Sequence, residues 1–264
     1  MKYIAGFIGC GNMGGALARA AASAIGGNNI AVCDYDKSKV SLLCSECGTV
    51  ELTLEEIFLN CKYVFLGVKP QAMENTLAPN IALINSSDSI IVTMAAALEI
   101  SFFEDRLGIT LPIIRIMPNM PASVREGMIL YDANSKVSND HICEFLNIMS
   151  ASGKLDNLSE GLIDAGSAIS GCGPAFAFMF AEALADAGVE CGLPRDKAIL
   201  YAAQMLKGSA ELLLKEKSPA SLKDKVCSPG GTTIAGVHAL EDGAFRSAVM
   251  NAVTAAYKRT LELK

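Results

Sequence analysis

Glycines at positions 9, 11 and 14 form a G-x-G-x-x-G pattern, in the segment Gly9-Cys10-Gly11-Asn12-Met13-Gly14. The pattern directly follows the short apolar stretch Ile4–Ile8 and leads into an alanine-rich run, Gly15–Ile25. In a strand–turn–helix unit the first glycine permits a tight turn, and the second lets the backbone approach a pyrophosphate. The third lets the helix pack closely on the strand, while the helix amino terminus offers amides to the phosphates. The sequence therefore predicts a dinucleotide site at this turn.

Asp34 lies 20 residues after Gly14, at the end of a second apolar stretch, Ile30–Cys33. An acid at this position accepts hydrogen bonds from the adenosine ribose and repels a 2′-phosphate, which favours NAD. Lys37 and Lys39 follow closely and could hold that phosphate instead. A solvent-exposed turn acid is the alternative interpretation of Asp34, so the choice between NADH and NADPH stays open.

Two further strand ends carry candidate coenzyme contacts. Tyr63–Val68 is a strand-like run closed by Lys69 and Pro70, at the edge of the sheet where such folds bind the nicotinamide half. Ile90–Met94 is followed by small residues, Ala95-Ala96-Ala97, which suit a flat ring but are equally explained by packing.

The segment Ser228-Pro229-Gly230-Gly231-Thr232-Thr233 is the most unusual in the chain. Two glycines after a proline free consecutive backbone amides, and three hydroxyls surround them. Amides at a helix amino terminus form an anion site suited to a carboxylate. A simple capped helix start explains the pattern about equally well, because Ser and Thr favour caps.

Strong acid–base groups are scarce. The only histidines are His141, predicted to be structural, and His238, which is more easily explained by packing than by a catalytic role. Reduction of a protonated imine needs no strong general base, so this scarcity favours imine reduction over alcohol oxidation. The nine cysteines are scattered, and the one C-x-x-C pair, Cys44 and Cys47, has no second pair to complete a metal site. They are predicted to be reduced in a cytoplasmic protein without a metal.

Composition sets the limits within which these groups must work. Half of the 264 residues are apolar, enough for a large core and a subunit interface. Lysines and arginines number 22 against 28 acids, which argues against nucleic acid or an anionic membrane as partner. No targeting segment is visible at the start, and the apolar stretches look too interrupted to span a membrane.

The elements that must position the site divide the chain in two. Strand-like stretches, now including Ile113–Ile116, alternate with helical segments such as Asn139–Met149 up to residue 158. This alternation predicts an α/β Rossmann domain, a doubly wound parallel sheet over residues 1–158. Residues 159–264 show no convincing strand and predict an all-α dimerisation and substrate domain. Its helices are expected over Gly173–Gly188, after Pro194 and after Gly231.

Together these motifs resemble the pyrroline-5-carboxylate reductase family, over nearly the whole chain. The final motif, Ser228–Gly236 with Leu240-Glu241, is close to diagnostic of the family. The motifs are Phe7–Met13, Val68-Lys69-Pro70-Gln71, Arg115–Ala122, Ser170–Phe176, Glu182–Gly188, Leu222-Lys223-Asp224, and Ser228–Gly236 with Leu240-Glu241.

The resemblance implies reduction of 1-pyrroline-5-carboxylate to L-proline by NADPH or NADH. It also implies a homodimer interlocked through the helical domain, often assembled into a decamer of five dimers. The implied coenzyme residues, besides Gly9, Gly14 and Asp34, are Gly11, Asn12, Met13, Val68, Lys69, Pro70, Ala95 and Ala96. The implied substrate residues are Val226, Ser228, Gly230, Gly231, Thr232 and Thr233, with Thr233 near the ring nitrogen and Glu216 as an acid close to the substrate.

Departures from the family pattern affect the shape of the pocket. Relatives often carry Ala-Ala-Gly where this chain has Ala95-Ala96-Ala97, and Met120 stands where Thr is usual. Many relatives also place Ser or Arg near the position of Asp34, to hold a 2′-phosphate. Of the properties that the resemblance implies, the family's usual preference for NADPH has the weakest support in this sequence.

Two alternative functions fit parts of the sequence. A β-hydroxyacid dehydrogenase or related imine reductase would carry a lysine in the first helix of the second domain, but Ser170–Ala181 contains none. A dinucleotide-binding sensor without catalysis would have its substrate pocket filled by bulky side chains, which the open Ser228–Thr233 segment argues against.

Overall fold

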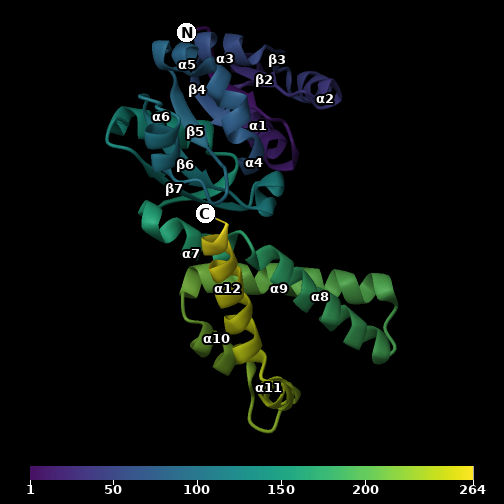
Figure 1. Ribbon diagram of the computed structural model, residues 1–264. Helices are drawn as coiled ribbons and strands as arrows, with labels where there is room; N and C mark the ends of the chain where they lie inside the picture. Colours follow the sequence, from purple (N-terminus) through teal and green to yellow (C-terminus); the bar gives the residue numbers. More distant parts are fainter. Residues whose placement is uncertain (264) are drawn as a thin grey trace. The chain divides into compact units, whose positions relative to one another are not determined.

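The computed structural model describes residues 1–263, which divide into two compact units (Figure 1). Unit 1 contains Met1–Gly171 and the residues from Ala256 onward, and unit 2 contains Cys172–Ala255. The helix α7, Glu160–Ser170, belongs to unit 1, whereas a boundary after residue 158 assigns it to the helical half. That boundary stays a prediction.

Unit 1 is built on one eight-stranded sheet with the order β3-β2-β1-β4-β5-β6-β7-β8. The predicted doubly wound fold is confirmed, because the order reverses at β1 and all neighbouring pairs but one are parallel. The exception is β7, which runs antiparallel to β6. The strands are β1 Tyr3–Ile8, β2 Ile30–Cys33, β3 Val50–Glu51, β4 Cys61–Leu66, β5 Ile90–Thr93, β6 Ile113–Met117, β7 Gly127–Ala133 and β8 Gly153–Asn157.

Helices cover both faces of this sheet, since the strands are apolar on both sides. One apolar core lies under α1, α2 and α6, and the other under α3, α4 and α5. Phe7 and Phe65 stack in the first core with ring centroids 4.4 Å apart. The helices are α1 Asn12–Ile25, α2 Lys37–Cys47, α3 Leu54–Asn60, α4 Pro70–Leu77, α5 Ile81–Ser86 and α6 Asn139–Ile148. Short 3₁₀ turns occupy η1 Gly27–Asn29, η2 Ala78–Asn80 and η4 Met120–Val124, and η3 Phe102–Arg106 is a π-helical turn.

Unit 2 is entirely helical, and residues 159–263 as a whole contain no strand. Its helices are α8 Gly173–Glu190, α9 Arg195–Glu216, α10 Pro219–Val226, α11 Thr232–Asp242 and the first part of α12, Phe245–Glu262. The small residues predicted to allow close helix contacts do so between α8 and α9, where a Cβ at Gly188 would lie 3.1 Å from Ala198 Cβ.

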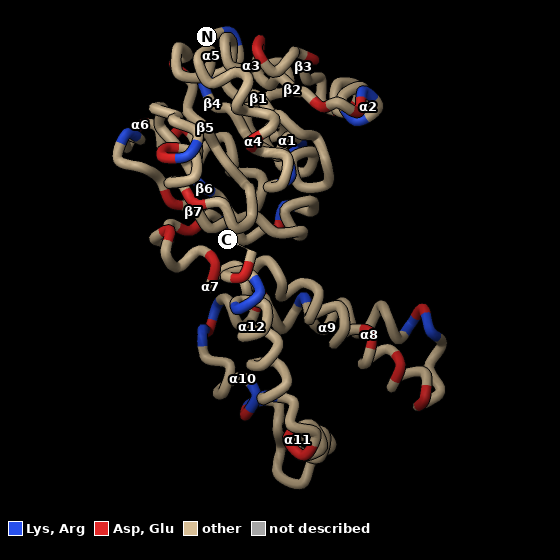
Figure 2. The backbone as a smooth tube through the Cα atoms, in the orientation of Figure 1, with Lys and Arg blue, Asp and Glu red and all other residues tan. Residues whose placement is uncertain are grey.

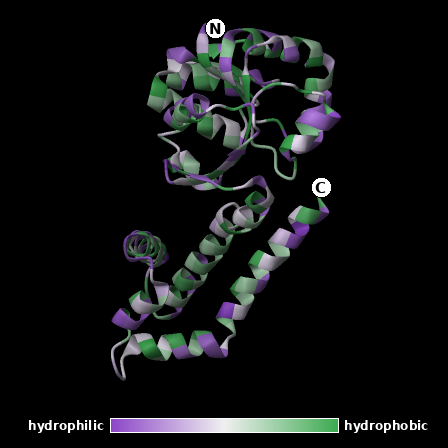
Figure 3. Cartoon of the chain, turned by 90° about the vertical axis from the view of Figure 1, so that its left-hand side faces the viewer, coloured by the Kyte–Doolittle hydropathy of each residue, from purple (hydrophilic) through white to green (hydrophobic). Residues whose placement is uncertain are grey.

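The helices of unit 2 expose much of their apolar surface. The charged residues of α8 and the start of α9 gather near the turn that joins the two helices (Figure 2), and many of the other residues in these helices are hydrophobic (Figure 3). Phe178 and Met179 are 59% and 68% exposed, and α10 and α11 bury no residue. Such a surface requires a covering partner.

One helical stretch, Glu160–Glu190, is long and apolar enough to cross a membrane by length and composition alone. The expectation that no such stretch exists is therefore wrong. The physical reason is that α7 and α8 follow each other across a short turn at Gly171–Cys172, so that their apolar residues add up. Only 11% of its most apolar window is buried within the chain.

Candidate functional site

Two glycine-containing turns, one after β1 and one after β4, pack against each other at the point where the strand order reverses. The Gly9 amide donates to Cys33 O, and the Gly67 amide donates to Ile8 O, both at 2.8 Å. A Cβ at Gly14 would lie 2.0 Å from Gly9 O, and one at Gly67 would lie 2.5 Å from the same oxygen. These three positions therefore exclude every side chain, and their packing brings the turns after β1 and β4 together.

The amino terminus of α1 is open. Gly11 is its N-cap residue, and no side chain caps the first turn. A Cβ at Gly11 would meet nothing within 4 Å, so packing within the chain does not require glycine there. A glycine that faces open space before an uncapped helix leaves the backbone accessible to a pyrophosphate. The residues present thus fit the predicted dinucleotide.

The coenzyme groove runs beside these two turns. We use this name for the 640 Å³ cavity lined by Gly9, Gly11, Asp34, Tyr35, Val68 and Lys69, among others. It lies at the carboxyl ends of β1, β2 and β4, where open α/β sheets bind ligands. Val68 and Lys69 follow β4, which ends at Leu66 rather than at Val68 as predicted, and Pro70 begins α4.

Asp34 holds the glycine turn in place. Its carboxylate accepts hydrogen bonds from the Cys10 amide at 2.6 Å and the Asp36 amide at 2.9 Å. The side chain is mostly buried but still lines the coenzyme groove, and each carboxylate oxygen can accept more than one hydrogen bond. Burial, together with the charge of Asp34, raises the pKa of the Cys10 thiol to about 12, so this cysteine is an unreactive packing residue.

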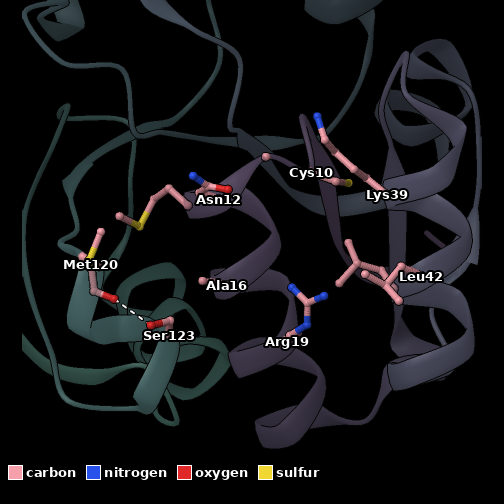
Figure 4. A pocket seen from close by; sticks show the side chains of 11 residues that line it. Cys10, Asn12, Ala16, Arg19, Lys39, Leu42, Met120 and Ser123 are labelled. Carbon is pink, nitrogen blue, oxygen red and sulfur yellow. Dashed lines mark hydrogen bonds between the residues drawn. The ribbon is translucent and has the colours of Figure 1, made fainter.

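A second cavity of 700 Å³ lies against the same glycine turn, between α1, α2 and η4 (Figure 4). Asn12 and Met13 line it from α1, and Met120 and Ser123 line it from η4. Arg19 also faces it and forms an ion pair with Glu46 at 2.7 Å. Asn12 and Met13 therefore line this second cavity rather than the coenzyme groove, whereas Gly11 and Lys39 line both.

Ala95 and Ala96, which the resemblance assigns to the coenzyme, line neither cavity. Ala95 is buried in the core and Ala96 is exposed. The next residue, Ala97, has a φ of 63°, in the left-handed region that favours glycine. The departure from the family's Ala-Ala-Gly therefore stores backbone strain beside the end of β5.

Replacing Ala97 by Gly is expected to stabilise the protein by about 1 kcal/mol, because glycine adopts this φ without steric cost. Thermal unfolding measures the effect as a small rise in melting temperature. Ala133→Gly, in a strand, is the matched control and is expected to lower it. An unchanged or lower melting temperature for Ala97→Gly would show that the turn is not strained.

A buried ion cluster that the sequence did not reveal fixes α7 to the sheet. Arg115, in β6, is fully buried and pairs with Asp164 at 2.8 Å and with Glu160 at 3.4 Å. The Glu160 amide donates to Asp132 at 2.6 Å, and Asn119 donates to Ser170 O at 2.9 Å, so both ends of α7 are held. The sequence feature that could have revealed this cluster is the single arginine within the apolar run Ile113–Met117, because a buried charge requires a partner of opposite charge.

The Ser228–Thr233 segment forms a tight turn before α11. The Gly231 amide donates to Ser228 O at 3.0 Å, and Gly230 has a φ of 67°. Proline at the second position and a left-handed glycine at the third are typical of a type II turn. Gly231 is the N-cap of α11, with no side-chain cap, and Thr232 and Thr233 are exposed in its first turn. The Gly231 amide is therefore used within the turn, whereas the uncapped first turn of α11 leaves the Thr232 amide and the two threonine hydroxyls open to an anion.

The other residues assigned to the substrate lie near this turn in the chain. Val226 ends α10 and is 65% exposed. Glu216 ends α9 and pairs with Lys225 of α10, so its carboxylate already has a cationic partner. His238 is not a packed histidine: its side chain is 78% exposed and lies 3.4 Å from Asp242. His141 is structural as predicted, since it forms a capping box with Ser138.

Among residues 1–263, no group of three or more His, Cys, Asp or Glu side chains could hold a metal ion.

Two family models match the chain. Residues 160–263 match the model described as pyrroline-5-carboxylate reductase dimerisation. Residues 4–97 match the model described as NADP oxidoreductase coenzyme F420-dependent.

Curated relatives and solved structures match along the whole chain. A pyrroline-5-carboxylate reductase of Escherichia coli is 37% identical, covering 100% of this chain and 99% of its own length. The pyrroline-5-carboxylate reductase 2 of Bos taurus is 40% identical, covering 98% of this chain and 83% of its own length. A pyrroline-5-carboxylate reductase structure from Coxiella burnetii superposes with a TM-score of 0.91 at 31% identity, covering 100% of this chain and 99% of that one. A Plasmodium falciparum pyrroline carboxylate reductase with NADP bound superposes with a TM-score of 0.87 at 32% identity, covering 98% of both chains.

Proposed function

Because the chain belongs to the pyrroline-5-carboxylate reductase family, we propose that it reduces 1-pyrroline-5-carboxylate to L-proline with NADH or NADPH. The observation that carries this proposal is the packing of the Gly9 and Gly67 turns against each other beside an open helix amino terminus. It supplies a dinucleotide site in a family whose members are named for this reaction. The β-hydroxyacid dehydrogenase alternative is not favoured.

On the coenzyme side, Gly9, Gly11 and Gly14 would shape the turn, and the amides of Asn12 and Met13 would bind the pyrophosphate. Asp34 would face the adenosine ribose, and Val68, Lys69 and Pro70 would flank the nicotinamide side with Ala95 and Ala96. The bound coenzyme supplies a hydride to the ring carbon of the imine. The chain itself then has only to bind, orient and exclude water from the reactants.

On the substrate side, the amides of Gly230 and Thr232 would hold the carboxylate, and the Thr233 hydroxyl would lie against the imine nitrogen. The Gly231 amide, predicted to share this role, instead closes the turn by donating to Ser228 O. Support for the other groups comes from the turn, which leaves them exposed before α11. Ser228 and Val226 would border the ring. When the charged iminium becomes a neutral amine, a hydroxyl beside the nitrogen can solvate both forms. Glu216, held by Lys225, would place its carboxylate near the charged iminium nitrogen of the substrate.

Replacing Thr233 by Ala is expected to lower kcat/KM for the pyrroline about tenfold or more, because one positioned hydrogen bond is lost, worth about 1–3 kcal/mol. Coenzyme affinity should hardly change, since the hydroxyl belongs to the substrate side. Steady-state kinetics and coenzyme titration measure the two quantities separately.

Two variants control this experiment. Thr233→Ser keeps the hydroxyl and should retain most activity, and Thr254→Ala removes an exposed threonine hydroxyl from α12 and should be neutral. Full activity of Thr233→Ala, or a selective loss of coenzyme binding, would remove this loop from the substrate site.

The reaction itself is tested by supplying 1-pyrroline-5-carboxylate with each coenzyme in turn and following the loss of the reduced nicotinamide. L-Proline must accumulate in proportion. If neither coenzyme is oxidised in the presence of the pyrroline, the proposed function is wrong.

The assembly in which this occurs is proposed to be a cytoplasmic homodimer, and further a decamer of five dimers. The exposed apolar surface of unit 2 and the match of residues 160–263 to a dimerisation model support the dimer. The nine unpaired cysteines suit a reducing compartment. Sedimentation velocity distinguishes a dimer from a decamer.

A further inference from the structure

Both lysines beside the adenosine end of the coenzyme groove already have acidic partners. Lys37 pairs with Glu51 at 2.6 Å, and Lys39 pairs with Asp36 at 3.4 Å. The hydrogen bond and charge of Glu51 raise the pKa of Lys37. Lys39 also lies over the Tyr35 ring, 5.6 Å from its centroid. Each lysine is therefore already paired with a carboxylate, although the sequence alone allowed both to bind a 2′-phosphate.

The acids of this turn outnumber its bases. Between β2 and the start of α2, Asp34 and Asp36 balance Lys37 and Lys39, and Glu51 of the neighbouring strand β3 adds one more negative charge. Acidic and basic positions lie close together along α2 and beside β2 (Figure 2). Arg19, which lines the second cavity, is paired with Glu46.

Asp34 and Asp36 are also fixed in place. The carboxylate of Asp34 is held by the Cys10 and Asp36 amides, and that of Asp36 accepts from the Ser38 amide at 3.1 Å as the N-cap of α2. Neither can rotate away without losing these bonds. A 2′-phosphate carries close to two negative charges at neutral pH and requires free cations or amides to bind. A ribose 2′-hydroxyl, in contrast, can donate to a carboxylate.

We propose that the coenzyme groove of this chain selects NADH over NADPH, with Asp34 accepting from the ribose and Asp36 and Glu51 withholding the two lysines from a 2′-phosphate. This inference rests on the proposed function, because it assumes that the groove binds the adenosine half of the coenzyme. Asp36 and Glu51 are specificity-determining residues that act through charge, and they need not touch the coenzyme.

Equilibrium titration of the full-length protein with NADH and NADPH, without pyrroline, tests the proposal by following nicotinamide fluorescence. At low ionic strength the dissociation constant for NADPH should exceed that for NADH by about tenfold or more, since like charges in a partly exposed site repel. Added salt should lower the ratio of the NADPH to the NADH dissociation constant, because it screens that repulsion.

Two variants identify the residues. Asp36→Asn keeps a good N-cap while removing the charge, and Glu51→Gln releases Lys37. Each should tighten NADPH binding about three- to tenfold and leave NADH binding within about twofold, and the double variant should show a larger shift than either. Glu74→Gln is the matched control: it removes an acid paired with Arg106 at 2.6 Å on the surface of the same unit, and it should change neither constant.

The outcomes separate this inference from the proposed function. Equal affinity for the two coenzymes, or variants that leave the ratio unchanged, would overturn the selectivity while leaving pyrroline reduction intact. Failure to bind either coenzyme would count against the proposed function as well. A variant that unfolds is recognised by its loss of NADH binding, and Asp36→Ser then provides a second capped replacement.

Discussion

Replacing Asp164 by Ala is expected to lower the free energy of unfolding by about 3–5 kcal/mol, because it leaves the Arg115 guanidinium buried without its nearest acid. Arg115 is fully buried, and its Nε already has no hydrogen-bond partner among residues 1–263. Glu160, at 3.4 Å and partly exposed, cannot replace a bond of 2.8 Å. The charge would therefore be left largely uncompensated.

Two variants test whether the expected loss of stability comes from the burial of the Arg115 charge. Glu46→Ala breaks an ion pair of similar length, 2.7 Å, in which both side chains are 43% exposed, and should cost at most about 1 kcal/mol. The double variant Arg115→Met with Asp164→Leu removes both charges and should recover most of the loss, since well-packed apolar residues can replace a buried ion pair.

Thermal unfolding provides the measurement. A loss of 3–5 kcal/mol should lower the melting temperature of Asp164→Ala by more than about 5 °C, whereas Glu46→Ala should stay within about 3 °C. Equal effects of the two single variants would show that burial does not set the energy of the Arg115 cluster.

Much of unit 1 could be predicted because buried parallel strands are short apolar runs between punctuating residues. Ile30–Cys33 was predicted at the bounds that the structure shows, and four other strands within one or two residues. Besides the two-residue strand Val50–Glu51, two strands were missed: the antiparallel strand Gly127–Ala133 and its neighbour Gly153–Asn157. The second of these, Gly-Lys-Leu-Asp-Asn, is half polar because it lies at the edge of the sheet, so its sequence resembles a loop.

The candidate site was predictable where its chemistry depends on the backbone. A glycine that must avoid another chain segment, such as Gly14 against Gly9, leaves a sequence pattern because no other residue fits. Side-chain partners leave no such pattern. The bonds from Asp34 to the Cys10 and Asp36 amides and the pairing of Lys37 with Glu51 depend on register between strands, which no local spacing records.

Replacing Gly14 by Ala is expected to weaken coenzyme binding about a hundredfold or more. Its Cβ would lie 2.0 Å from Gly9 O, a backbone atom that cannot move without moving the whole turn. The helix α1 must then shift by more than about 1 Å, which takes its first amides away from the pyrophosphate. Losing two hydrogen bonds to a charged group, each worth about 1.5–3 kcal/mol, weakens binding by two orders of magnitude or more. The melting temperature should fall as well, because Gly14 and Gly67 pack against the same oxygen.

Gly11→Ala separates coenzyme binding from folding. Its Cβ would meet nothing within 4 Å and its φ of −65° suits any residue, so the melting temperature should fall by only a few degrees, because alanine is a poorer N-cap than glycine. Coenzyme affinity should nevertheless fall, since the methyl group would project from the turn toward the pyrophosphate. Gly161→Ala, also without neighbours within 4 Å but at the start of α7, should leave coenzyme affinity unchanged and should, if anything, raise the melting temperature slightly, because alanine is the better helix former. If Gly11→Ala binds both coenzymes as tightly as the unmodified protein, the pyrophosphate does not lie on this turn, and the close packing of Gly9, Gly14 and Gly67 serves the fold alone.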